Sequence, residues 1–115
     1  MRLKNLFKDL EYVGEAAGDR LSYAVFRGPS AYLVVSPNSR EGFNVNVVRR
    51  EAPEVIRKRF HGRRVTTGSV VKASRRRDLF PSRFTLLNSL YVMVALRWAK
   101  KLKEREGRSM VFKIG

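Results

Sequence analysis

The chain has 115 residues, of which 43% are hydrophobic, and this suits one domain spanning residues 1–115 with a single core. Lysine and arginine number 25 against ten acids, so the formal charge is +15 and a polyanionic partner is expected. The absence of cysteine excludes disulfides, cysteine nucleophiles and thiolate-bound zinc, and the absence of any 18-residue apolar run predicts a soluble cytoplasmic protein.

The first third of the chain predicts a helix followed by a hairpin. Apolar residues recur every three or four positions from Leu3 to Val13, which predicts a short helix ending near Gly14 or Gly18. Residues 21–26 and 31–35 are rich in tyrosine, valine and phenylalanine, and the turn-forming tetrad Arg-Gly-Pro-Ser separates them. These two runs predict a β-hairpin.

The middle of the chain predicts a strand and two short helices. Residues 43–47 alternate strictly between apolar and amide side chains, which is typical of a strand. Pro53 suits the first turn of a helix that ends around Gly62. Thr66 or Thr67 could cap another helix running to the triplet at 75–77, although a strand starting at Val65 fits this stretch as well.

The last third predicts a long helix and a closing strand. Pro81 and Ser82 introduce a periodic segment from about residue 83 to 105, with Gly107 as its cap. Residues 109–114 alternate again and predict a strand that joins the earlier hairpin. The expected fold is α+β, with a small antiparallel or mixed sheet of about four strands packed on helices, including one long C-terminal helix.

That long helix is apolar nearly all round, which is more apolar surface than one sheet can cover. Either neighbouring helices wrap around it or one side meets a second subunit. Because twofold dimers are the commonest assemblies, we expect a homodimer formed through this helix.

Positive charge is concentrated in the middle third of the chain. Residues 49–83 contain 12 basic and three acidic residues, and paired or tripled arginines recur at the ends of the expected elements. Such positions suit contacts with phosphate groups, although a solvated helical face or helix-dipole complementation would leave a similar pattern.

The expected sheet offers aromatic and amide side chains that could stack on bases or bind their edges, although most strand aromatics belong to cores. Together with the basic residues they form the candidate nucleic-acid-binding set: Arg49, Arg50, Arg57, Arg63, Arg64, Lys72, Arg75, Arg76, Arg77, Arg83, Tyr32, Phe43, Asn44 and Asn46.

The sequence shows no catalytic or metal-binding pattern, and no cofactor is expected. His61 is the only histidine, so a site built from several histidines or cysteines is excluded. The acids form no paired-carboxylate motif, and neither a glycine-rich phosphate loop nor a nucleophile elbow is present. A nuclease would require residues that only folding brings together.

The order of hairpin, third strand, short basic helices, long apolar helix and closing strand resembles the ThermoDBP-related single-stranded DNA-binding proteins of hot-living archaea over residues 20–115. The resemblance implies an apolar cleft with basic rims, in which bases enter the cleft and phosphates lie on the rims.

These observations favour a sequence-tolerant binder of single-stranded DNA, or of RNA, that performs no reaction. A second hypothesis is a double-stranded DNA binder of winged-helix type, in which residues 65–77 would belong to the recognition helix and the closing strand to a wing. A third is a structural component of a large ribonucleoprotein, since high charge and small size are common there, and a fourth is a nuclease.

Overall fold

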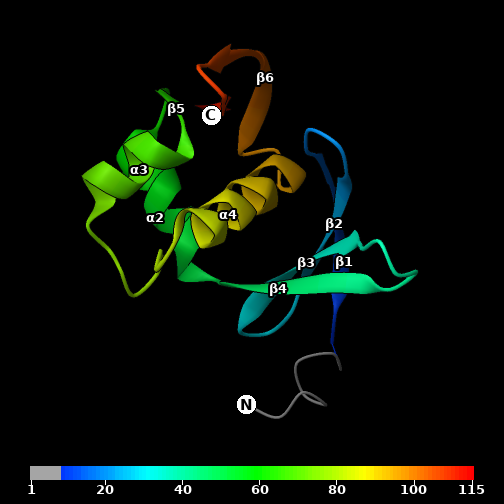
Figure 1. Cartoon of the computed structure of the whole chain (residues 1–115). Coiled ribbons are helices and arrows are strands. Elements are labelled where there is room, and N and C mark those ends of the chain that lie inside the picture. The colour runs from blue at the N-terminus through cyan, green and yellow to red at the C-terminus, as the bar shows by residue number, and fades with distance from the viewer. Residues whose placement is uncertain (1–8) are drawn as a thin grey trace.

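The structure is a computed structural model in which residues 9–115 are described. Seven strands and three helices follow one another along these residues: β1 (Glu11–Ala17), β2 (Ser22–Arg27), β3 (Ala31–Pro37), β4 (Phe43–Arg49), α2 (Glu51–Phe60), β5 (Arg64–Val65), α3 (Thr67–Ser74), α4 (Arg83–Ala95), β6 (Ala99–Glu106) and β7 (Ser109–Ile114). The strands form two separate sheets (Figure 1). The α+β class is therefore confirmed.

The larger sheet is an antiparallel meander in the order β1-β2-β3-β4. The predicted hairpin is confirmed as β2 and β3, and the alternating segment is confirmed as β4. The predicted N-terminal helix is wrong over residues 11–13, which begin β1, and its part before residue 9 lies outside the described residues. The register of β1 shifts between Tyr12 and Gly14, and glycine at 14 permits close packing on α4, because a Cβ there would lie 3.2 Å from the carbonyl oxygen of Ala95.

The smaller sheet has the order β5-β7-β6 and was not expected. The closing strand, β7, pairs with β5 and β6, so the prediction that it joins the earlier hairpin is wrong. Its neighbour β6 occupies residues that the sequence assigned to the long helix. Gly107, expected as a helix cap, instead has a φ of 61° in the tight turn between β6 and β7, where glycine avoids the steric cost of a positive φ.

Helix α4 lies in the middle of the molecule, with the larger sheet on one side and α2, α3 and the smaller sheet on the other (Figure 1). Its residues Leu86 and Leu90 are fully buried, as are Val92 and Met93. The apolar surplus of this helix is thus covered within the chain, so it supplies no argument for a dimer formed through α4. No helix in residues 9–115 is both long and apolar enough to cross a bilayer.

The predicted long C-terminal helix is wrong because α4 ends at Ala95, in mid-chain. The backbone N–H of Trp98 donates to the carbonyl of Met93, and that of Arg97 donates to Val94. With Arg97 at a φ of 64°, this is the Schellman pattern that ends a helix. The residue in the left-handed conformation is arginine rather than the usual glycine, so nothing in the sequence signals that the helix ends here.

Helices α2 and α3 confirm the two short helices predicted between residues 53 and 75. Thr66 caps α3 by accepting a hydrogen bond from the backbone N–H of Ser69, whose hydroxyl in turn accepts one from the N–H of Thr66. The strand and the helix expected around Val65 are each realised in part, because this residue belongs to the short strand β5 just before the cap.

Candidate nucleic-acid interface

The segment joining α3 to α4 carries three consecutive arginines and is anchored at both ends. Helix α3 ends at Arg75, which adopts a left-handed conformation with a φ of 53°. Further along, Leu79 and Phe80 are buried, and their backbone N–H groups donate to the carbonyl of Arg76. The apolar pair fixes the segment to the core, so the arginines lie exposed on a well-packed support.

A concave pocket of about 620 Å³ lies between α3 and this segment. Four of its lining residues are cationic and none is acidic. We call it the arginine pocket and define it by its lining residues: Val71, Lys72, Ser74, Arg75, Arg76, Arg77, Phe80, Pro81 and Ser82.

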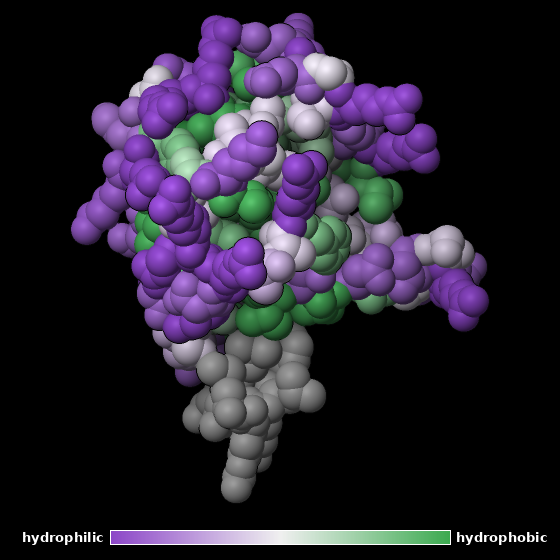
Figure 2. Space-filling view, turned by 60° about the vertical axis from the view of Figure 1, so that its left-hand side comes forward, coloured by the Kyte–Doolittle hydropathy of each residue, from purple (hydrophilic) through white to green (hydrophobic). Residues whose placement is uncertain are grey.

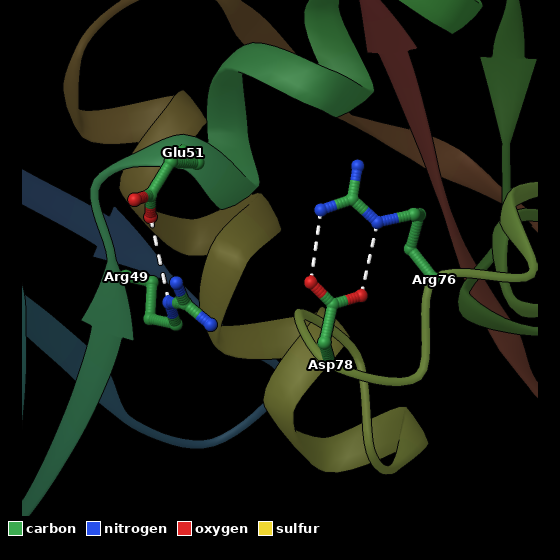
Figure 3. Close-up of polar contacts among 4 residues, drawn as sticks. All are labelled: Arg49, Glu51, Arg76 and Asp78. Atoms are coloured by element: carbon green, nitrogen blue, oxygen red, sulfur yellow. Dashed lines mark hydrogen bonds and ion pairs between the residues drawn. The ribbon is translucent and has the colours of Figure 1, made fainter.

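One carboxylate lies next to the pocket and binds one of its four cations. The Nε and Nη2 atoms of Arg76 each donate to Asp78 at 2.9 Å (Figure 3). The two hydrogen bonds from Arg76 lower the pKa of Asp78 to about 2, and the same bonds raise the pKa of Arg76. Glu51, at the start of α2, raises the pKa of Arg76 slightly further.

The other three pocket cations, Lys72, Arg75 and Arg77, have no ion pair within residues 9–115. Their charges are therefore balanced only by solvent and mobile ions. Three unpaired cations around one concavity form a local excess of positive charge.

The first turn of α4 follows the pocket-lining Ser82 and carries a cation and an aromatic ring. Ser82 lines the pocket and caps α4 by accepting from the N–H of Thr85 at 3.1 Å. Arg83 lies beside α3, since its Nη2 atom is 3.7 Å from the position of a Cβ on Gly68. Phe84 is 60% exposed, although it belongs to a helix whose middle is buried. The periodicity of this apolar segment gave no signal that Phe84 would be exposed.

Figure 2 shows the face of the molecule turned toward α2 and α3. Long hydrophilic side chains gather over this face and surround a paler centre where apolar groups are visible. The face thus combines hydrophilic side chains with accessible apolar surface.

The other five predicted arginines contact parts of the fold rather than the pocket. Arg49 pairs with Glu51 at 3.5 Å (Figure 3), and Arg64 pairs with Glu104 at 3.0 Å. The remaining three lie against rings of the chain: Arg50 at 5.3 Å from the centre of Tyr32, Arg57 at 4.4 Å from Trp98, and Arg63 at 5.5 Å from Phe60. Of the ten predicted cations, four therefore line the pocket, five are engaged in these intramolecular contacts, and Arg83 lies beside α3.

The four predicted strand residues do not form a common platform. Tyr32 is buried with 3% exposure on the sheet face toward α4, so its ring is not available for stacking on a base. Asn44 and Asn46 share that face by strand alternation, whereas Phe43 lies on the opposite face with 69% exposure. The alternating pattern predicted the strand β4, but it did not indicate which face of the sheet α4 covers.

A second basic hollow, of about 690 Å³, lies between β6 and the turn that joins β1 to β2. We call it the β6 hollow; its charged lining residues are Asp19, Arg97, Lys100, Lys101, Lys103, Glu104 and Arg105. Here Asp19 contacts two cations, Arg105 at 2.9 Å and Lys101 at 3.3 Å. Hydrogen bonding from Arg105, followed by that from Lys101, lowers the pKa of Asp19.

Groups typical of metal or catalytic sites do not converge in the described residues. No cluster of three or more histidine, cysteine or acidic side chains that could hold a metal occurs in residues 9–115. The Nδ1 atom of His61 lies 2.8 Å from the backbone oxygen of Gly115, where the chain ends.

The chain was compared with protein-family models, curated proteins and solved structures, and none of the three comparisons gave a match.

Proposed function

We infer that the protein binds single-stranded nucleic acid without strong sequence preference, and that the arginine pocket is its principal phosphate-binding site. The observation that carries this proposal is the presence of Lys72, Arg75 and Arg77 around one concavity without a carboxylate partner in the described residues. The binding reaction requires no cofactor.

The chemistry of the pocket supports a phosphate ligand. Guanidinium groups bind phosphate oxygens through two parallel hydrogen bonds, which ammonium groups cannot do. Because Leu79 and Phe80 anchor the segment to the core, little backbone entropy is lost when the arginines bind. Arg76 keeps its Asp78 contact and helps to hold the segment in place.

The exposed ring of Phe84 supports a nucleic acid rather than a simple anion. A base whose phosphate binds in the pocket could stack on Phe84, two residues beyond the pocket-lining Ser82. Base stacking on aromatic side chains tolerates any sequence and contributes roughly 1–3 kcal/mol per base. Unpaired bases offer their faces for such stacking, whereas bases in a duplex do not.

The double-stranded hypothesis has one structural argument for it and one against it. The order helix, strand, helix, helix, hairpin from α2 to β7 provides the elements that a winged-helix binder uses. A helix-turn-helix protein places its second helix in the major groove. The element order makes that helix α4, rather than residues 65–77 as expected from the sequence, and α4 is buried along most of its length between the two sheets. Burial of α4 therefore favours the single-stranded ligand.

The decisive experiment measures fluorescence anisotropy with labelled oligonucleotides of equal length, as single- and double-stranded DNA and as RNA, over a series of salt concentrations. We expect tighter binding to single strands of mixed sequence and a steep loss of affinity with salt, because bound cations release counterions from the strand. Tighter binding to the duplex would overturn the proposal, and so would an affinity that is independent of salt.

A triple charge reversal tests the location of the site. Lys72→Glu, Arg75→Glu and Arg77→Glu together leave the Arg76–Asp78 pair intact. We expect an affinity loss on the order of 100-fold. The slope of log affinity against log salt concentration, called the salt slope, should become shallower by about 2. The matched control reverses Arg20, Arg40 and Arg108, which are exposed in turns elsewhere and change the net charge equally. Equal losses in both variants would mean that the pocket is not the site.

A further inference from the structure

Strand β4 forms an open edge of the larger sheet. Among the described strands it pairs only with β3, so the outward N–H and C=O groups of its other side meet no strand. Natural proteins usually protect such edges with lysine, proline or a covering segment. From Phe43 to Val48 this strand contains no charged residue and no proline.

One face of the same strand is apolar and exposed. Phe43, Val45 and Val47 are 69%, 48% and 54% exposed, and they alternate along the strand. Across the sheet, Val47 lies opposite Leu33 and Val45 opposite Val35, so the exposed side chains continue an apolar face. The edge thus offers both unpaired backbone groups and apolar side chains.

We propose that β4 pairs antiparallel with β4 of a second copy of this chain, forming a twofold dimer with a continuous eight-stranded sheet. The twofold axis passes beside Val45, which faces the same residue of the other copy. In this register Phe43 lies opposite Val47 of the second copy. An aromatic residue opposite a β-branched one is a favourable cross-strand pair.

Charge at the two ends of the strand favours this register. Each chain carries a formal charge of +15, so two copies repel each other unless the contact surface is neutral or complementary. The strand itself is neutral from Phe43 to Val48. Glu41, in the turn before β4, comes opposite Arg49 of the second copy, and the twofold axis creates this opposite-charge pair twice. The arginine pocket contains no residue of β4 and stays accessible in both copies.

A single introduced cysteine tests the axis directly, because the natural chain has none. With Val45→Cys, the two Cα atoms come within about 4.5–5.5 Å, which suits a disulfide. With Val47→Cys, the two copies of residue 47 lie roughly 14 Å apart along the strands, too far for a disulfide. After mild oxidation we expect a covalent dimer for Val45→Cys and little for Val47→Cys on a non-reducing gel.

A charge exchange tests the register without a covalent bond. Glu41→Arg alone and Arg49→Glu alone each place like charges across the axis, and we expect dimer dissociation constants higher on the order of tenfold by analytical ultracentrifugation. The double variant restores opposite charges and should recover most of the affinity. Tyr12→Lys, which charges an exposed apolar site on β1 at the opposite edge of the same sheet, should leave the dimer unchanged.

The inference is overturned if the natural chain is monomeric at tens of micromolar in the absence of nucleic acid. It is also overturned if both cysteine variants cross-link equally, or if the double charge variant dimerises no better than the single ones. None of these measurements involves nucleic acid, so their result is independent of the proposed function.

Discussion

The arginine pocket and the β6 hollow are both concave and basic and have similar volumes, about 620 and 690 Å³, but they differ in where their carboxylates lie. In the β6 hollow, Asp19 contacts two cations at once. Beside the arginine pocket, Asp78 contacts only Arg76 and leaves three cations without an ion pair in the described residues. In the β6 hollow, Arg97, Lys100 and Lys103 likewise have no ion pair in the described residues, so the two hollows differ in their lining acids: Asp19 and Glu104 lower the positive charge of the β6 hollow, whereas no acid lines the arginine pocket.

The two regions also differ in how the backbone presents the charges. The arginines of the pocket follow a capped helix on a segment fixed by Leu79 and Phe80. The cations of the β6 hollow lie on a strand whose pairing with β7 is irregular between Lys101 and Arg105. A fixed support loses less conformational entropy on binding, which again favours the arginine pocket.

Removal of the exposed aromatic ring of Phe84, in the first turn of α4, should have the largest effect of the three predictions that follow. For Phe84→Ala we expect about a tenfold loss of affinity for single-stranded oligonucleotides, because a stacking contact of roughly 1–3 kcal/mol is lost. Anisotropy titration at fixed salt measures it. Tyr12→Ala removes a ring that is 56% exposed on β1 and serves as the control. The same loss in both variants would contradict a specific role for Phe84.

Removal of the acid from the β6 hollow should make it more like the arginine pocket. Asp19→Asn frees Lys101 and Arg105, so we expect affinity for single strands to rise about two- to threefold and the salt slope to steepen by about one. Glu15→Gln, an exposed change on β1 that also removes one negative charge, is the matched control. If both variants gain equally, the effect comes from net charge alone.

The smallest expected effect concerns acid titration of Asp78. Because its folded-state pKa of about 2 lies below its usual 3.8, ionised Asp78 stabilises the fold above pH 3.8, and this contribution is lost as pH falls through 2. The pair is exposed, so the change in unfolding free energy should be small. NMR titration of the carboxyl carbon measures the pKa directly. In Arg76→Gln it should return toward 3.8, and an unchanged value would contradict the assigned cause.

Local patterns were enough to predict several elements. The alternation from residue 43 to 47 predicted β4, the turn tetrad predicted the hairpin of β2 and β3, and Thr66 and Ser82 predicted helix starts. These features act within a few residues, through strand periodicity and capping hydrogen bonds, and therefore appear in the sequence. The arginine triplet belonged to the candidate set from the start for the same reason, because it is contiguous.

Other outcomes depended on contacts between distant residues. The sequence did not reveal the end of α4 at Ala95, because the lysines that follow suit a helix end as well as they suit β6, and only pairing with β7 decides between the two. The burial of Tyr32 follows from which sheet face α4 covers. Whether an arginine is paired also depends on distant acids, as with Arg64 and Glu104, forty residues apart.

The sequence by itself therefore determined the α+β class, most short elements and the excess of positive charge in the middle of the chain. The tertiary structure alone decided that the chain builds two sheets, that α4 is covered within the chain, and that Lys72, Arg75 and Arg77 are the predicted cations left unpaired around a pocket in the described residues. The physical reason is range: periodicity and capping act over one or two turns, whereas burial and ion pairing join residues that only the folded chain brings together.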